Sequence, residues 1–323
     1  MWYDVASEEL YMKNRKLQLA GLLAAVIAAG TIVAYTSGIA GKAASLLRGG
    51  SEESMPDTEW ILGNYNDASG SQGMFYTLKN NSDGTLIVID GGWTENAAQV
   101  RQVIKDNGDH VTAWFITHTH NDHVGAFNEI FKDPQGITID MVYDANVDYA
   151  EYKTLIPDWD TFDRYPEYES AIGDADNITH LSRDDEFMID DLKVKVFNAY
   201  DSKTVKKGKD DIVNNSSLML KFEGEKDSVL FCGDVHSGKM SKMLIKRYGE
   251  ELEAEYVQPG HHGNNSLTES FYEVVKPQIA VFDATEHIMT AEEYSAAELK
   301  EYFESEGVEV YDYRTCPHFF AFE

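Results

Sequence analysis

The sequence predicts an α/β fold in which strands and helices are arranged in layers. Short apolar runs with the length of buried strands alternate with amphipathic stretches of helical periodicity. The order strand, helix, strand recurs from residue 58 onward, and this order is typical of layered α/β domains. The chain has 323 residues, 43% of them hydrophobic, which is enough for one domain with a substantial core and some additional segments.

The first 57 residues differ from the rest of the chain. Residues 1–16 are mostly polar and end in a basic cluster, and residues 17–35 form an uncharged, apolar run of about 19 residues. A helix of that length spans a bilayer, and the basic cluster predicts that residues 1–16 are cytoplasmic. We therefore predict a transmembrane signal anchor at 17–35, a linker at 36–57 and an extracytoplasmic domain at 58–323. The alternative is a cleaved signal peptide, which would give a secreted protein.

The domain is predicted to begin with a pair of strands. These are Gly73–Leu78 and Thr85–Ile89, and the Asn-, Asp- and Gly-containing segment between them has the composition of a hairpin turn. The second strand ends in Asp90-Gly91-Gly92, where glycine permits close backbone approach. Thr94 is positioned to cap a helix that runs to about Asn107.

The next strand leads into the most informative stretch of the chain. The apolar run Val111–Ile116 predicts a buried strand, and Val124–Phe131 predicts the start of a helix. Between them lies Thr117-His118-Thr119-His120-Asn121-Asp122-His123. Three of the ten histidines therefore fall in a short turn at the end of a strand, which favours a functional site over a chance cluster.

The spacing within this stretch favours a pair of metal ions. His118 and His120 are two residues apart and point the same way in an extended segment. Asp122 and His123 follow the turn and can face a neighbouring point. Imidazole nitrogens and carboxylate oxygens are ligands for zinc and similar divalent metals, so the stretch predicts two adjacent ions.

The segment Tyr143–Ser170 interrupts the alternation with aromatic residues interleaved with carboxylates. One interpretation is a helical excursion whose aromatic side chains pack on the core. The other is a substrate-facing insertion in which Trp159 and Tyr165 bind a cationic group such as choline. Both interpretations remain open from the sequence alone.

The rest of the chain repeats the alternation of strands and helices. The predicted strands are Leu192–Ala199, Ser217–Glu223, Ser228–Cys232, Glu255–Gln258, Gln278–Phe282 and Val308–Tyr311, and the predicted helical segments are Ser237–Tyr248, Thr268–Val275 and Ala291–Ser305.

The histidine stretch resembles the H-x-H-x-D-H signature of the metallo-β-lactamase-fold hydrolases. Leu86–Gly92 is similar to the family's strand ending in Asp-Gly, Val229–Asp234 to its strand with the metal-bridging Asp, and Gly260–Ser266 to its last histidine motif. Asn214–Leu218, together with Cys-Gly-Asp and Gly-His-His-Gly, most resembles the branch that contains the extracellular domain of the competence protein ComEC and the phosphorylcholine esterases. The resemblance implies an αββα four-layer sandwich, preceded here by the predicted N-terminal transmembrane helix.

The resemblance also implies a ligand set for two divalent ions, with Zn expected and Mn or Fe as alternatives. Metal one takes His118 and His120, metal two takes Asp122 and His123, Asp234 bridges both, and His262 completes metal two, with the neighbouring His261 as the alternative. Many members have a further histidine for metal one, whereas the matching segment Asn214–Ser217 contains none. His180 lies further upstream and could replace it only by an unusual loop path. Three protein ligands would leave metal one an open position, as a catalytic ion requires.

Four other residues complete the predicted site. Asp90 is expected either to orient a metal-bound histidine or to serve only as a turn residue at the strand end. Asp122 is counted with His261 and Asn215 among the catalytic candidates, the last two as hydrogen-bond donors to the substrate or leaving group. Asn265 is expected to contact substrate or to cap the following helix.

Charge narrows the range of substrates. Net charge is −29, from 27 Lys and Arg against 56 Asp and Glu, which disfavours an extended nucleic acid as partner. A small phosphodiester is compatible, because bound metals dominate the local field.

We therefore predict a membrane-tethered, binuclear metal-dependent hydrolase. Its expected substrate is a phosphoester, most plausibly a phosphodiester, in a small molecule or the cell envelope. The alternatives are a β-lactamase- or lactonase-type hydrolase, which the missing histidine disfavours, and a catalytically silent metal-binding module. The sequence carries no indication of the oligomeric state.

Overall fold

The computed structural model describes residues 59–67 and 70–323. The predicted segments 1–16, 17–35 and 36–57 lie outside these residues, so the membrane anchor stays a prediction. Among the residues that are described, no helix is both long and apolar enough to cross a membrane.

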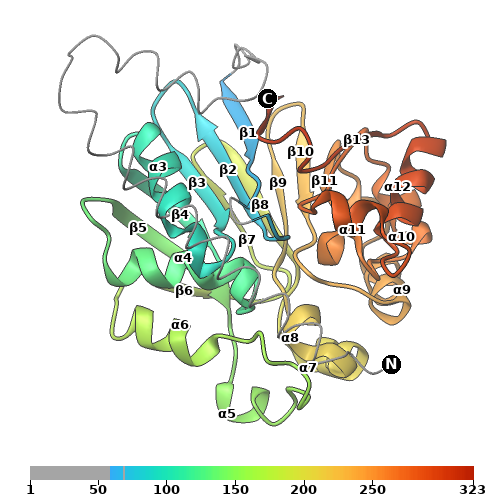
Figure 1. Ribbon diagram of the computed structural model, residues 1–323, viewed down its shortest axis with the longest axis horizontal. Helices are drawn as coiled ribbons and strands as arrows, with labels where there is room; N and C mark the ends of the chain where they lie inside the picture. The colour runs from blue at the N-terminus through green and yellow to red at the C-terminus, as the bar shows by residue number, and fades with distance from the viewer. Residues whose placement is uncertain (1–58, 68–69) are drawn as a thin grey trace, which may run out of the picture. The chain divides into compact units, whose positions relative to one another are not determined.

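Two seven-stranded sheets form the centre of the described region (Figure 1). In spatial order, the first sheet contains β14 (His318–Phe322), β1 (Trp60–Asn64), β2 (Phe75–Asn80), β3 (Leu86–Asp90), β4 (His110–Phe115), β5 (Thr138–Ala145) and β6 (Ile178–Leu181). The second contains β13 (Glu309–Tyr311), β12 (Ile279–Val281), β11 (Tyr256–Gln258), β10 (Ser228–Phe231), β9 (Met219–Glu223), β8 (Leu192–Asn198) and β7 (Glu186–Ile189).

Helices cover the outer faces of both sheets and the end where the excursion lies. The first sheet carries α3 (Ala97–Asp106), α4 (Asn121–Lys132) and α6 (Tyr165–Ile172), and the second carries α9 (Gly238–Tyr248), α10 (Glu269–Val275), α11 (Glu286–Thr290) and α12 (Ala296–Ser305). Short helices α5 (Tyr149–Tyr152), α7 (Ser202–Gly208) and α8 (Ile212–Asn215) and 3-10 turns at Thr94–Asn96, Lys209–Asp211, Gly249–Leu252 and Gly260–Gly263 complete the described elements.

Three large hydrophobic clusters hold these layers together. The central cluster joins the inner faces of the two sheets and includes Phe115 from β4 and Phe222 from β9, whose rings are 5.3 Å apart. One outer cluster packs α3, α4 and α6 on the first sheet, and the other packs α9, α10 and α12 on the second. Strand β3 is buried along its whole length because it is covered on both faces, which explains its unbroken apolar sequence. The predicted α/β fold with two sheets is confirmed.

Parallel pairing brings the functional segments together. β3 pairs with β4 in parallel, as do β10 with β11 and β11 with β12. The carboxyl ends of parallel strands lie at the same edge of a sheet, which is where ligands bind in open α/β sheets. The segments after β3, β4, β10 and β11 are the four segments that the sequence singled out.

The structure differs from the sequence-based prediction in three places. Helix α4 begins at Asn121 rather than Val124, so Asp122 and His123 lie in its first turn. The segment Tyr143–Ser170, for which a helical excursion was one of two interpretations, contains the end of β5, α5 and part of α6, with irregular chain between them. Strands β1, β5, β6, β7 and β14 were not predicted. For β6 and β7 the reason is that short, partly exposed strands lack a continuous apolar run.

Candidate metal centre

The loop after β4 and the first turn of α4 carry four candidate ligands, His118, His120, Asp122 and His123. Residues 117–120 lead from the strand into α4, and the backbone N–H of His123 donates to the carbonyl of His120 at 3.0 Å. Gly91 N–H donates to the carbonyl of His123 at 2.9 Å, and Met74 N–H donates to that of Asp122 at 3.0 Å. The first turn of α4 is therefore fastened to the segments after β3 and before β2.

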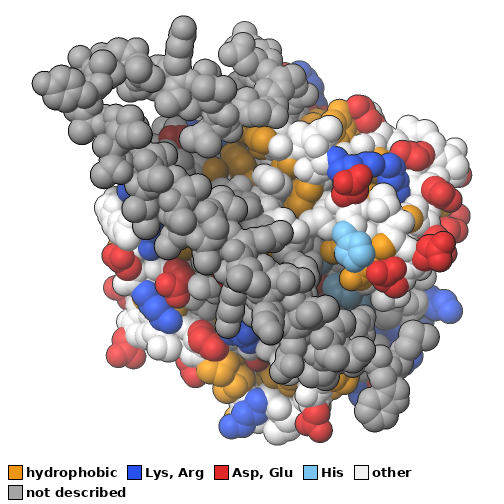
Figure 2. Space-filling view, viewed as in Figure 1, with side chains coloured by type: hydrophobic (Ala, Val, Ile, Leu, Met, Phe, Trp, Pro, Cys, Tyr) orange, Lys and Arg blue, Asp and Glu red, His pale blue; other side chains and the backbone are white. Residues whose placement is uncertain are grey.

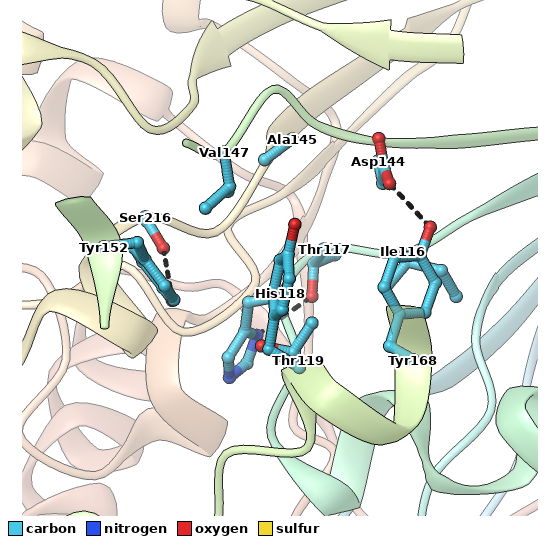
Figure 3. A pocket seen from close by; sticks show the side chains of 11 residues that line it. Ile116, Thr117, His118, Thr119, Asp144, Ala145, Val147, Tyr152, Tyr168 and Ser216 are labelled. Carbon is cyan, nitrogen blue, oxygen red and sulfur yellow. Dashed lines mark hydrogen bonds between the residues drawn. The ribbon is translucent and has the colours of Figure 1, made fainter. Parts of the chain in front are cut away.

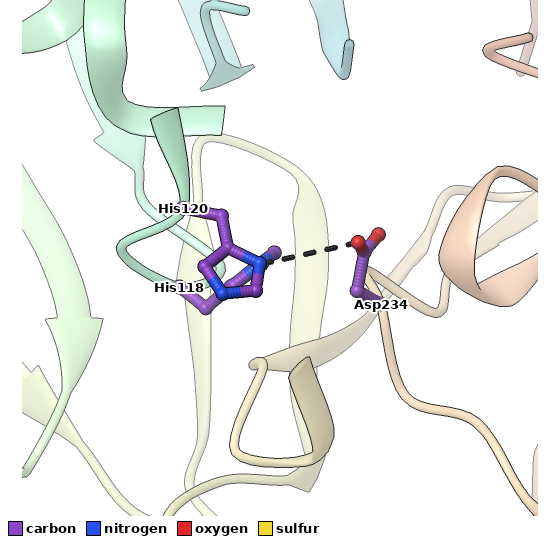
Figure 4. Close-up of side chains that lie close together, drawn as sticks. All are labelled: His118, His120 and Asp234. Carbon is purple, nitrogen blue, oxygen red and sulfur yellow. Dashed lines mark ion pairs between the residues drawn. The ribbon is translucent and has the colours of Figure 1, made fainter. Parts of the chain in front are cut away.

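The first group of candidate ligands contains His118, His120 and Asp234. All three are buried, and one ligand atom of each lies within 4.8 Å of those of the other two. Figure 4 shows the two imidazoles facing the carboxylate, with His118 Nε2 at 3.9 Å from Asp234 Oδ2.

The second group contains Asp122, His123 and His262, which lie equally close together and are also buried. His262 Nε2 lies 3.4 Å from Asp122 Oδ2 and 3.5 Å from Asp234 Oδ2. His123 Nε2 lies 3.2 Å from Asp234 Oδ1. Asp234 therefore contacts members of both groups, as expected of a bridging ligand.

The unpaired atoms of these residues fit divalent cations. Nε2 of His118, His123 and His262 and Oδ1 of Asp234 are buried without a hydrogen-bond partner. The pair His123 Nε2 and Asp234 Oδ1 is close but not aligned as a hydrogen bond. An unsatisfied buried polar atom costs about 1–3 kcal/mol, so this arrangement needs a further partner. Imidazole nitrogen and carboxylate oxygen converging on one space are the donor set of zinc, manganese or iron.

Carboxylates outside the two groups hold three of the four histidines. Asp90 Oδ2 lies 2.7 Å from Nδ1 of His123, and the same carboxylate accepts hydrogen bonds from the N–H and Oγ1–H of Thr117 at 2.8 and 2.6 Å. Asp283 Oδ1 lies 3.4 Å from Nδ1 of His262. Such outer contacts orient metal-bound histidines, so Asp90 lies where its predicted role requires.

Asp160 holds His120, and the sequence analysis did not single it out. Its carboxylate is fully buried and lies 2.9 and 3.1 Å from His120 Nε2, but it belongs to neither ligand group. In the sequence it is one of many acidic residues of the excursion, and no spacing marked it. Asp283 could have been predicted from the sequence, because it follows an apolar strand as Asp90 and Asp234 do.

The excursion is anchored on the histidine loop next to Asp160. Asn121 N–H donates to the carbonyl of Phe162 at 3.1 Å, and Arg164 N–H donates to that of Thr119 at 2.7 Å. Asp163 accepts from the hydroxyl of Thr119. Residues 160–164 therefore form one wall of the centre.

A tight turn directs one histidine of the pair inward. His261 and His262 both have positive φ, 55° and 54°, which is uncommon for residues with a side chain. A Cβ at Gly260 would lie 2.1 Å from the carbonyl oxygen of Val235, so this approach requires glycine. His262 joins the second group, whereas His261 Nδ1 lies 2.7 Å from the carbonyl of Asn264 and 3.4 Å from His236 Nδ1.

Asn215 and Asn265, two further predicted residues, lie in different surroundings. The amide of Asn215 is used within the protein, donating to the carbonyl of Asp211 at 2.9 Å and accepting from the N–H of His236 at 3.1 Å. Asn265 lies with His236 in the lining of an open groove of about 780 Å³.

The aromatic candidates of the excursion are separated. Trp159 is 61% exposed. Tyr165 stacks on Tyr149 with ring centroids 4.2 Å apart, and it lines a small cavity next to His118. Figure 3 shows this cavity with His118, Tyr152 and Tyr168 among the residues that line it. The cavity holds about 20 Å³, roughly the space for one water. His180 lies in β6 and contacts Asp144 instead of the centre.

Charges within the centre shift the pKa values of its members. Burial lowers the pKa of His123, but the carboxylates of Asp234 and Asp90 together outweigh burial and raise the pKa to about 10. Burial raises the pKa of Asp122, but the close contact with His262 and the charges of His123 and His262 lower it to about 2. Burial followed by the charge of His123 lowers the pKa of His118 well below its usual value. Burial also raises the pKa of Asp234, but the charges of His123 and His262 hold it well below its usual value, so the carboxylates of Asp122 and Asp234 are available to a cation.

Comparisons with known proteins agree on the fold. A family model of the metallo-beta-lactamase superfamily matches residues 70–139. The diiron beta-hydroxylase CmlA from Streptomyces venezuelae is similar with a TM-score of 0.53 and 12% identity over 83% of this chain and 55% of that chain. This chain thus spans about half the length of CmlA. The metallo-beta-lactamase fold protein YhfI from Bacillus subtilis is similar with a TM-score of 0.49 and 9% identity over 81% of this chain and 99% of that chain.

No curated protein matches the sequence. The same fold follows from the two sheets, from the family match that includes the histidine stretch and from the likeness to CmlA. None of these findings separates the predicted ComEC-like branch from other branches of the superfamily. The described residues have the fold of the metallo-beta-lactamase superfamily, and their two groups of buried His and Asp residues are candidate ligands for metal ions.

Proposed function

We propose that this protein is a binuclear metal-dependent hydrolase that cleaves phosphoesters, in the first place phosphodiesters. The observation that carries the proposal is the pair of buried His and Asp groups that Asp234 joins, in which Nε2 of His118, His123 and His262 and Oδ1 of Asp234 lack hydrogen-bond partners. Metal one would be held by His118, His120 and Asp234, and metal two by Asp122, His123, His262 and Asp234.

Two divalent ions held in this way polarise an ester oxygen and lower the pKa of water to near neutrality. The protein contributes orientation through Asp90, Asp160 and Asp283, which hold His123, His120 and His262. His261 lies beside His236 at the rim, where an imidazole can donate a hydrogen bond to a leaving group. The burial of every ligand keeps bulk water from competing with these interactions.

The choice of a phosphoester rests on the set of protein ligands and the resemblance of their motifs to the phosphodiester-cleaving branch. In the segment Asn214–Ser217 the amides and hydroxyls bond mainly within the protein, and no imidazole is present to complete metal one. An ion with three protein ligands has a position for a substrate oxygen. The missing histidine in Asn214–Ser217 also disfavours the β-lactamase- or lactonase-type alternative.

Tethering by residues 17–35 to the outer side of a membrane is part of the proposal. A choline-type leaving group also remains a proposal, but the cavity that Tyr165 lines beside His118 has room for only about one water, so choline would have to bind outside that cavity, where Trp159 is exposed.

Hydrolysis of bis-p-nitrophenyl phosphate and of nitrocefin by the zinc-, manganese- or iron-loaded protein tests the function. We expect turnover of the phosphodiester only, and a loss of at least 100-fold in kcat/KM for Asp234→Ala, because that change removes a ligand from both ions. Asp140→Asn, at an exposed carboxylate, is the matched control and should retain full activity. Turnover of nitrocefin alone would replace the proposal with the β-lactamase alternative, and stoichiometric metal binding without either activity would favour the binding module.

A further inference from the structure

A groove beside α7 and α9 gathers positive charge in a strongly acidic protein. It holds about 590 Å³ and is lined by six basic residues, Lys203, Lys207, Lys239, Lys242, Lys246 and Arg247. The whole chain has only 27 Lys and Arg against 56 Asp and Glu. On the face that Figure 2 shows, Asp and Glu side chains are spread over the described surface, so a concentration of cations is unusual for this molecule.

Helical periodicity builds this basic groove. Lys203 and Lys207 are one turn apart on α7, and Lys242 and Lys246 are one turn apart on α9. The two helices pack against each other, which places the two lysine pairs around one space. Like charges four residues apart destabilise a helix, so the arrangement opposes folding stability and needs another reason.

Most of this charge is uncompensated. Lys239 forms an ion pair with Asp210 at 3.0 Å, and Arg247 pairs with Asp184. Lys203, Lys207, Lys242 and Lys246 form no ion pair with any residue that the structure describes. The groove therefore presents four ammonium groups without an ion pair among the described residues, although Lys203 still interacts at longer range with Asp184.

A short series of contacts joins the basic groove to the metal centre. Asp210, the partner of Lys239, precedes Asp211, and Asp211 Oδ2 lies 3.5 Å from His236 Nε2. His236 in turn lies against His261, the neighbour of the ligand His262. Lys239 of the groove is thus connected to the centre through Asp210, Asp211, His236 and His261.

We propose that the basic groove binds successive phosphate groups of a phosphodiester chain, one ester of which reaches the metal centre. This names the substrate class and rests on the proposed function for the ester at the metals. Four lysines can bind a row of phosphates, since an ammonium group attracts phosphate as a point charge and does not select for the geometry of the rest of the ligand. The lining contains Met243 but no aromatic side chain, so it lacks the stacking surface that proteins use for single-stranded nucleic acid. The favoured ligand is a chain recognised by its charge spacing alone.

Calorimetric titration of the full-length, metal-loaded protein with linear inorganic polyphosphate tests the groove. The paired variants are Lys203→Gln with Lys207→Gln, which removes two groove charges, and Lys206→Gln with Lys209→Gln, which removes two charges from exposed positions outside the lining. Both variants change the net charge equally, so only the position differs. We expect the groove variant to bind at least 10-fold more weakly and with a shallower salt dependence, and the control to bind within 2-fold of the parent.

Other ligands and one further variant separate the outcomes. Polyaspartate binding as tightly as polyphosphate would overturn the choice of phosphate, and oligothymidylate binding more than 10-fold tighter would show recognition of bases instead of charge. If both lysine variants bound polyphosphate equally weakly, the lysines would act only through their long-range charge, and the groove would not be the binding site. In the Asp234→Ala background, Lys203→Gln with Lys207→Gln should weaken polyphosphate binding by the same factor as in the parent, so failure of hydrolysis and failure of the groove are distinguishable.

Discussion

Each histidine of the centre has one ring nitrogen held by a neighbouring oxygen. For His118 this is the hydroxyl of Thr117 at 3.2 Å, and for the other three it is a carboxylate. For His118, His123 and His262 the opposite nitrogen, Nε2, has no hydrogen-bond partner and is left for a cation, and the outer contact orients the ring. The sequence predicted the inward-facing residues, because H-x-H-x-D-H is local in the chain. It did not predict Asp160 or Asp283, because those contacts join segments that are distant in sequence.

The contact of Asp160 with His120 leads to a prediction about metal affinity. Asp160→Ala should weaken binding of one of the two ions by about 10- to 100-fold and leave the other unchanged, because only His120 loses its outer contact. Competition with a chelator of known affinity measures both constants.

Asp158→Ala is the matched control, since this carboxylate lies in the same loop and is exposed. Asp160→Asn should restore most of the affinity, because its amide oxygen still accepts from His120. A uniform loss for both ions in Asp160→Ala would instead indicate general unfolding of the loop.

At the scale of elements, a buried arginine fastens the segment that supports Asp234. Arg183 donates to the carboxylate of Asp201 at 2.6 Å, to the carbonyl of Phe197 at 2.7 Å and to Asn198 Oδ1 at 2.9 Å. Asn198 Nδ2 in turn donates to the carbonyl of Ser217 at 2.8 Å, and Ser217 Oγ accepts from the N–H of Asp234 at 3.1 Å. The network connects the start of α7 with the strand end at the metal centre.

Arg183→Met should lower the free energy of unfolding at pH 7 by about 3 kcal/mol. This is the lower end of the range for breaking a buried ion pair, because the Asp201 side chain keeps some exposure. Burial raises the pKa of Asp201, but the hydrogen bond from Arg183 and those from backbone N–H groups lower it below its usual value. The stability from this pair is therefore present above about pH 4, the ordinary range of Asp, and is lost as pH falls through the lower folded value.

Urea unfolding at pH 7 and at pH values below 4 measures this difference. The gap between parent and variant should narrow in acid, whereas Lys105→Met, at an exposed position of α3, should leave stability unchanged throughout. A gap that stays constant down to the lowest pH at which the parent folds would assign the effect to packing of the arginine stem alone.

On the scale of the whole molecule, the candidate metal centre lies where the two sheets meet. His118, His120 and His123 follow β4 of the first sheet, and Asp234 and His262 follow β10 and β11 of the second. The central strands β3, β4 and β10 were predictable, because burial on both faces produces continuous apolar runs. The pairing of the two halves was not, since strand order depends on contacts across the chain. It entered the prediction only through the resemblance.

Because ligands come from both sheets, bound metal should hold the two halves of the sandwich together. A ligand that binds only the folded state, at 1,000 times its dissociation constant, adds about 4 kcal/mol to stability. For a domain of this size each kcal/mol raises Tm by roughly 2–4 °C, so stripping the ions with EDTA should lower Tm by about 10 °C. Differential scanning calorimetry with metal analysis of each sample measures the shift. His262→Ala with Asp234→Ala is the control, and EDTA should hardly change its Tm, because its ligands from the second sheet are gone. If complete metal removal left the Tm of the parent unchanged, the ions would not join the two sheets, and the centre would be held by the protein's own contacts.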